Sequence, residues 1–68
     1  MNNFPETLKK YRLSKDLTQR EIAEFIGMTA NAYQKYELGT RVPKLDVLIQ
    51  LADIFHVSLD ELVGRKLP

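Results

Sequence analysis

Cysteine is absent from the 68 residues of this sequence. Its absence excludes disulfide bonds and thiolate metal sites, and with them the disulfide-stabilised secreted mini-proteins, so we expect a protein of the cytoplasm. Long apolar runs are also absent, and no stretch approaches the roughly 20 residues that a membrane span requires. The first ten residues lack the apolar segment of a signal peptide, and we expect no membrane partner.

Residue types that carry catalysis or bind cofactors are equally sparse. His56 is the single histidine, and one histidine cannot supply the several converging ligands of a metal site. Ser14 and Ser58 have no histidine–carboxylate arrangement near them, and the three glycines are isolated rather than grouped in a phosphate-binding loop. We therefore expect no metal, no cofactor and no enzymatic activity. His56 instead suits the C-cap of a helix, because histidine tolerates left-handed backbone better than most residues.

The composition indicates one small globular domain covering residues 1–68. Hydrophobic residues make up 44% and charged residues 28%, as in ordinary folded proteins. The net charge of +1 conceals an uneven distribution, since residues 9–44 carry eight basic and four acidic side chains, whereas residues 45–64 carry four acidic and no basic ones. The basic part is a candidate surface for a polyanion, although ordinary solvated faces would give the same pattern.

Two helices are predicted by apolar residues at helical spacing. The first covers about residues 4–15, with Asn3 at its N-cap and Pro5 in its first turn. The residues expected on its inner face are Leu8, Tyr11 and Leu13. The second follows Pro43, and its stripe consists of Leu45, Leu48, Leu51, Ala52 and Phe55.

Three shorter helices are predicted by signals at their ends. Thr18 with Glu21, and Ser58 with Glu61, each have the spacing of a capping box. Thr29 is placed to cap the helix between them. Glycines that suit C-caps follow the three helices, at Gly27, Gly39 and Gly64. The residues expected on inner faces are Ile22, Ala23, Ile26, Tyr33, Tyr36 and Leu62. No alternating β-branched run predicts a strand, so the expected fold class is all-α, with five short helices.

Residues 18–37 have the pattern of a helix-turn-helix motif. Two short helices meet at Gly27-Met28-Thr29. The glycine lets the backbone bend without strain, the methionine side chain fills the space at the bend, and the threonine starts the next helix. The outer face of the second helix carries small or hydrogen-bonding residues, which suit base edges in a major groove. These residues are Ala30, Asn31, Gln34 and Lys35.

At these residues the sequence resembles the phage-repressor and Cro-type helix-turn-helix regulators, the Xre family. The resemblance runs from about Leu8 to Leu62, and it depends on many positions at family spacing rather than on one short motif. The positions that carry it include Leu8, Tyr11, Arg12, Leu17, Thr18, Gln19, Ile22, Ala23, Gly27, Met28, Thr29, Tyr36, Glu37, Gly39, Pro43 and the apolar stripe from Leu45 to Leu62.

The resemblance implies a lambda-repressor-like domain that binds double-stranded operator DNA as a homodimer and regulates transcription, as a repressor. It implies that Ala30, Asn31, Gln34 and Lys35 read bases, that Gln19 touches phosphate and braces the reading helix, and that Thr29 touches phosphate. It also implies an ion pair between Arg12 and Glu37. The basic stretch adds phosphate contacts from Arg20, Arg41 and Lys44.

Several features leave alternatives open. Ala30, Lys44 and His56 depart from the residues common in the family, so the base sequence that is read stays open. A dimer contact is expected from Leu59, Val63 and Leu67, which one small core need not bury, although they would equally fit the edge of that core. The alternative functions are an antitoxin-type operator-binding protein and a protein-interaction module that keeps the fold without binding DNA.

Overall fold

The computed structural model describes residues 3–65, and this part of the chain is helical, with no strand. Its helices are α1 (Phe4–Ser14), α2 (Gln19–Phe25), α3 (Ala30–Leu38), α4 (Leu45–Phe55) and α5 (Leu59–Val63). The predicted all-α fold with five short helices is confirmed. None of the helices in the described range is long and apolar enough to cross a membrane.

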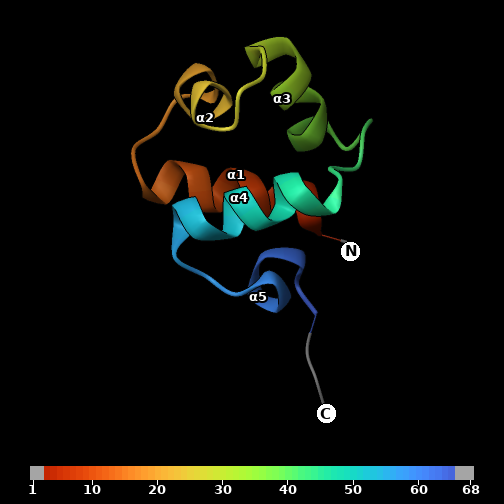
Figure 1. The fold of residues 1–68 in the computed structure, drawn as a ribbon. Helices are drawn as coiled ribbons and strands as arrows, with labels where there is room; N and C mark the ends of the chain where they lie inside the picture. The colour runs from red at the N-terminus through yellow and green to blue at the C-terminus, as the bar shows by residue number, and fades with distance from the viewer. Residues whose placement is uncertain (1–2, 66–68) are drawn as a thin grey trace.

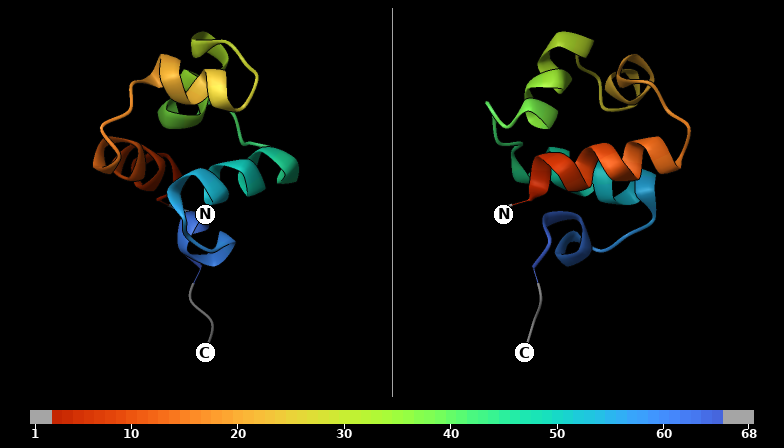
Figure 2. Two further views of the ribbon diagram at one scale, coloured as in Figure 1. Left: turned by 60° about the vertical axis from the view of Figure 1, so that its left-hand side comes forward. Right: turned by 180° about the vertical axis from the view of Figure 1, so that it is seen from behind.

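The helices lie at three levels. α2 and α3 form one end of the molecule, α1 and α4 occupy the middle, and α5 lies at the opposite end (Figure 1). The same order is visible when the molecule is turned (Figure 2). α1 packs against both α3 and α5, and α2 packs against α3. In this arrangement α1 supports the α2–α3 pair, and the outer side of α3 is left uncovered.

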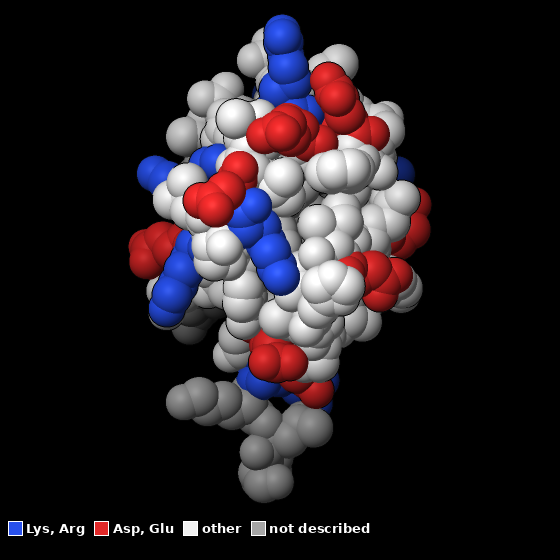
Figure 3. Space-filling view, turned by 90° about the vertical axis from the view of Figure 1, so that its left-hand side faces the viewer, with Lys and Arg blue, Asp and Glu red and all other residues white. Residues whose placement is uncertain are grey.

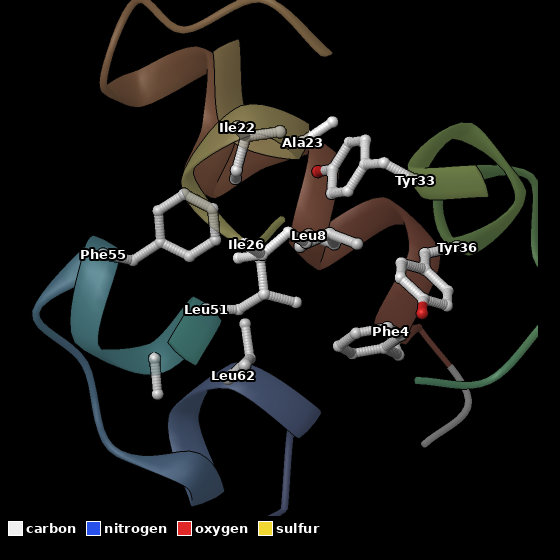
Figure 4. Packing of buried hydrophobic residues seen from close by; sticks show 11 residues of the cluster. Phe4, Leu8, Ile22, Ala23, Ile26, Tyr33, Tyr36, Leu51, Phe55 and Leu62 are labelled. Atoms are coloured by element: carbon white, nitrogen blue, oxygen red, sulfur yellow. The ribbon is translucent and has the colours of Figure 1, made fainter. Parts of the chain in front are cut away.

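The core takes side chains from all five helices. Its buried hydrophobic members are Phe4, Leu8, Ile22, Ala23, Ile26, Tyr33, Tyr36, Leu51, Ala52, Phe55 and Leu62. The rings of Tyr33 and Tyr36 reach inward from α3, with Tyr36 beside Phe4 (Figure 4). These two rings meet edge-on at a centroid distance of 6.1 Å. The prediction that both tyrosines face inward is confirmed.

Side-chain hydrogen bonds start three of the helices as the sequence predicts. The Thr18 hydroxyl accepts from the Glu21 N–H at 3.0 Å, and the Glu21 carboxylate accepts from the Thr18 N–H at 2.9 Å. Ser58 and Glu61 form the same reciprocal pair before α5. The Thr29 hydroxyl accepts from the Ala32 N–H at 3.1 Å and caps α3. Each bond satisfies a backbone donor that the first turn of a helix leaves unpaired.

Left-handed backbone ends three of the helices. Gly39 caps α3 with φ +78°, and a Cβ at this residue would lie 3.3 Å from Pro5 Cγ. Gly64 caps α5 in the same way. His56 caps α4 with φ 56° and ψ 44°, as predicted. Asp16, in the α1–α2 joint, is also left-handed at φ 55°, which no signal in the sequence predicted.

Asn3 is the N-cap of α1 as predicted, but its side chain makes no capping hydrogen bond, and its backbone carbonyl accepts from the Thr7 N–H. Two expectations about the helix faces are wrong. Leu13 is 53% exposed, because the buried face of α1 follows Phe4, Leu8 and Arg12 at intervals of four residues. Leu45 is 65% exposed, since the part of α4 that packs on the core begins only at Val47.

Candidate nucleic-acid interface

The turn between α2 and α3 sets the direction of α3. Gly27 takes φ +72°, and the next residue, Met28, is half-buried and packs against the core. The Met28 N–H donates to the Ala23 carbonyl at 2.9 Å, which ties the turn to the end of α2. Thr29 then starts α3 with its capping hydroxyl. The two helices therefore meet at a joint held by packing and backbone hydrogen bonds.

The outer face of α3 carries the residues predicted to read bases. Asn31, Gln34 and Lys35 are exposed, and Ala30 is half-buried at the start of the helix. They form two adjacent pairs, one helical turn apart, so they share one side of the helix. Tyr33 and Tyr36 lie on the opposite side, in the core. The structure thus brings the four residues together on an accessible helical surface.

The residues predicted to contact phosphate lie before and after α3 in the chain. Gln19 and Arg20 begin α2, and Thr29 caps α3. Arg41 and Lys44 are exposed in the joint that leads to α4. α2 and this joint lie on opposite sides of α3 in Figure 1 and in the right-hand view of Figure 2. The elements that carry these residues therefore flank α3 and do not cover its outer face.

Arg12 and Glu37, the expected pair, join α1 to α3 through two hydrogen bonds. Arg12 Nε donates to Glu37 Oε2 at 2.7 Å, and Arg12 Nη2 donates to Oε1 at 3.1 Å. The exposed fractions of the two side chains are 9% and 4%, so the pair is shielded from solvent. Arg12 Nη1 also donates to the Leu17 carbonyl at 2.7 Å, which holds the joint before α2.

Two further side chains complete the network around Glu37. Gln19 Nε2 donates to Oε1 at 3.1 Å, and the Tyr33 hydroxyl donates to Oε2 at 2.5 Å. The sequence predicted only an inward-facing ring for Tyr33, although its spacing of four residues from Glu37 on one helix was a usable signal for this bond. One carboxylate therefore connects α1, the start of α2 and α3.

The network shifts the pKa values of its members. Burial acts to raise the pKa of Glu37, but the hydrogen bonds from Arg12, Tyr33 and Gln19 outweigh it and hold that pKa below its ordinary value. The hydrogen bond to Glu37 raises the pKa of Arg12, although burial acts to lower it. Burial first, and then the bond to Glu37, raises the pKa of Tyr33 well above its ordinary value. At neutral pH the network is an ion pair with a neutral phenol.

Charge is not segregated on the side of the molecule that includes the joint between α1 and α2. Basic and acidic side chains are interspersed there, with uncharged surface between them (Figure 3). A surface of this kind gives little net attraction for a polyanion, because neighbouring charges of opposite sign cancel at a distance. The basic surplus of residues 9–44 therefore does not appear as one continuous basic patch on this side.

The residues expected at a dimer contact have different environments. Leu59 is 37% exposed, and Val63 is half-buried and packs against the core. Leu67 lies outside the described residues. Other apolar side chains between the end of α3 and the first half of α4 are more exposed. They are Leu38, Val42, Leu45 and Ile49, with exposed fractions of 65%, 68%, 65% and 44%. The exposure of Leu38, Leu45 and Ile49 was not predicted from the sequence.

Comparisons with known proteins bear on this geometry. A family model described as helix-turn-helix matches residues 8–62. The chain is 48% identical over 60 residues to the uncharacterized HTH-type transcriptional regulator YqaE of Bacillus subtilis, covering 88% of this chain and 52% of that protein. It is 38% identical over 60 residues to the cryptic phage CTXphi transcriptional repressor RstR of Vibrio cholerae, covering 88% of this chain and 54% of that one.

Among solved structures, a transcriptional regulator from Listeria innocua matches with a TM-score of 0.89 at 34% identity, covering 96% of this chain and 61% of that one. The chain spans about half the length of the curated relatives named above. The matched stretch includes α2, the turn and α3, together with Arg12 and Glu37. By its sequence and its fold, this chain belongs to the Xre-type helix-turn-helix family.

Proposed function

We propose that this chain is a sequence-specific DNA-binding transcriptional regulator of the cytoplasm, acting as a repressor with α3 in the major groove of operator DNA. The observation that carries the proposal is the exposed polar face of α3, held in a fixed direction by the turn and by the Glu37 network. The relatives named as transcriptional regulators and as a phage repressor support it.

The side chains on α3 have chemistry that suits base edges. Asn31 lies in the first turn, and its amide can donate to and accept from the N7 and N6 edge of adenine. Gln34, one turn later, can make the same pair. Lys35 can donate to O6 and N7 of guanine, and the small Ala30 leaves room for a thymine methyl. These four residues would supply the sequence preference.

Side chains around α3 suit the phosphate backbone. Arg20, Arg41 and Lys44 are exposed cations, and Gln19 and Thr29 offer uncharged donors at the starts of α2 and α3. Contacts of this kind fix the position of a protein on the duplex and carry no sequence information of their own. We assign these five residues to positioning rather than to reading.

The assignment is tested by comparing two variants on the same DNA. A duplex is first selected from a random-sequence pool with the wild-type protein, and single-base variants of it are prepared. Asn31→Ala should lose about 1–3 kcal/mol of binding free energy and relax the preference at one base pair per half-site. Gln19→Ala should weaken binding to all the variants by a similar factor. If Gln19→Ala alters base preference and Asn31→Ala weakens every duplex equally, the two roles are reversed.

We further propose that the protein binds as a homodimer, because one short helix reads too few bases for tight specific binding. Two-fold symmetry would place two reading helices one turn of DNA apart, about 34 Å. The proposed contact involves α5, which lies at the end of the molecule opposite the α2–α3 pair (Figure 1) and which contains the exposed Leu59. The selected duplex should then show two-fold symmetry.

The contact surface is tested by matched substitutions in the two apolar regions. Leu59→Lys should weaken binding to the symmetric duplex and leave binding to a single half-site unchanged. Leu45→Lys, at the exposed start of α4, is the control. If Leu45→Lys weakens binding to the symmetric duplex and Leu59→Lys does not, the dimer contact involves the start of α4 and not α5. An asymmetric selected duplex would contradict dimeric binding at either surface.

A further inference from the structure

The hydroxyl of Tyr33 occupies an unusual position for a core tyrosine. The residue is 0% exposed, and its hydroxyl donates to Glu37, one helical turn further along α3. Its ring is held edge-on against Tyr36 and reaches into the core (Figure 4). A tyrosine has two side-chain torsions, so packing of the ring also fixes the place of the oxygen. The hydroxyl is therefore a rigid reference point that belongs to α3.

Arg12, the other anchor of Glu37, is a different kind of partner. Its guanidinium fixes the plane of the carboxylate, but it reaches Glu37 on a long side chain from another helix. The Arg12–Glu37 unit is anchored at its Arg12 end by the bond from Nη1 to the Leu17 carbonyl, in the joint before α2. The Tyr33 hydroxyl bonds to the same oxygen as Arg12 Nε, and it ties this unit to α3 itself.

Gln19 depends on the position of that carboxylate. Its Nε2 donates to Glu37 Oε1, and because a carboxylate only accepts, the amide has to present its nitrogen to Glu37. The second N–H of Nε2 and the amide oxygen of Gln19 are then left for other partners. Gln19 is half-buried at the first position of α2, so this end of its side chain is partly accessible.

We propose that Tyr33 is a positioning residue for DNA binding, whose hydroxyl fixes Glu37 and through it the Gln19 amide that contacts a phosphate. The proposal rests on the function proposed above, in which Gln19 touches the DNA backbone. Tyr33 is fully buried and cannot contact DNA itself. Its effect on DNA affinity therefore acts through Glu37 and Gln19. The effect is independent of sequence, because the contact at the end of the chain of hydrogen bonds is to phosphate.

The test uses Tyr33→Phe, which removes the hydroxyl and keeps the ring. Tyr36→Phe is the matched control, since Tyr36 is also buried on α3 and is not part of the Glu37 network. Dissociation constants are measured on the selected duplex and on an unrelated duplex of equal length, at a temperature where every variant is folded. Tyr33→Phe should raise both constants by about three- to tenfold, and Tyr36→Phe should leave them unchanged.

The route through Gln19 is tested with a double-mutant cycle. In a Gln19→Ala background the effect of Tyr33→Phe should disappear, because the side chain that it positions is gone. A readout without DNA is the pair of side-chain amide NMR signals of Gln19, which should shift in Tyr33→Phe and not in Tyr36→Phe.

Four results would overturn the proposal, three of them in the binding measurements. The first is wild-type affinity in Tyr33→Phe, and the second is an equal loss in Tyr36→Phe. The third is an undiminished loss when Gln19→Ala is already present, which would mean that the hydroxyl acts on the whole of α3. If the wild-type protein selects no duplex, the proposed function fails as well. If it binds DNA and the Gln19 signals stay unmoved in Tyr33→Phe, the positioning proposal fails alone.

Discussion

Glu37 accepts hydrogen bonds on both carboxylate oxygens from Arg12, Gln19 and Tyr33. Removing one partner of a buried ion pair leaves the other charge in a poorly solvated place without compensation. We therefore expect Arg12→Ala and Glu37→Ala each to lower the free energy of unfolding by about 1–4 kcal/mol. Chemical denaturation measures this loss. Unchanged midpoints and slopes in both variants would mean that the pair contributes nothing to stability.

The lowered pKa of Glu37 predicts how stability depends on acid. A carboxylate with a lower pKa in the folded state binds its proton more readily after unfolding, so it stabilises the fold above the ordinary pKa of 4.5. This contribution is lost as the pH falls below that value toward the pKa of the folded state. Glu37→Gln cannot titrate, and its unfolding free energy should fall less steeply over this acidic range than that of the wild type. Parallel curves for the two proteins would contradict the expectation.

At the scale of single elements, most of the residues that cap the helices were predicted correctly from the sequence. The capping boxes at Thr18 and Ser58, the cap at Thr29 and the left-handed His56 follow from local chemistry, in which a side chain or a backbone angle acts on its own neighbours. Such features are readable in a sequence because they do not depend on the rest of the fold. Asn3 was the exception, since its capping pattern was present and its side chain made no bond.

Faces and networks were harder to predict because they depend on what packs nearby. Leu13 and Leu45 fit an apolar period and still lie exposed, since a period does not tell which of its members a neighbouring helix will cover. The bond from Tyr33 to Glu37 needed a carboxylate and a ring in one buried space, where the sequence predicted only an inward-facing ring. The residues on the outer face of α3 were predictable, because helical spacing alone assembles them.

His56 gives a prediction at the scale of one helix. A side chain in the left-handed region strains the backbone by about 1–2 kcal/mol, whereas glycine avoids that strain and costs about 0.5–1 kcal/mol more in backbone entropy. His56→Gly should therefore stabilise the protein by about 0.5 kcal/mol, since His56 is exposed and ends α4 at φ 56°. Thermal unfolding measures this gain in stability. Asp53→Gly, in the last turn of α4, is the control and should be destabilising. A lower melting temperature in His56→Gly would show that its side chain stabilises the cap.

At the scale of the whole molecule, the number of cations that neutralise phosphates sets how DNA affinity depends on salt concentration. Each phosphate neutralised by a cation contributes about −0.9 to the slope of log affinity against log salt. Arg41→Ala should therefore flatten the slope by about 0.9 for each phosphate that it no longer neutralises, or about 1.8 in a two-fold dimer. Gln19→Ala should weaken binding at every salt concentration and keep the slope, because its contact is uncharged. Titration across salt concentrations distinguishes the two. A slope that is flat in the wild type would rule out binding dominated by phosphate contacts.

The central position of α1, which packs against both α3 and α5, also bears on how the chain folds. The α2–α3 pair is made from neighbouring segments and can form its contacts early, since short loops close at little entropic cost. α1, although it comes first in the chain, has one of its partners near the other end. Its hydrophobic face therefore stays partly uncovered until α5 docks. Because α5 covers the rest of this face, its loss would expose part of the core. We therefore expect the domain to fold and unfold in one cooperative step, without separate unfolding of α5.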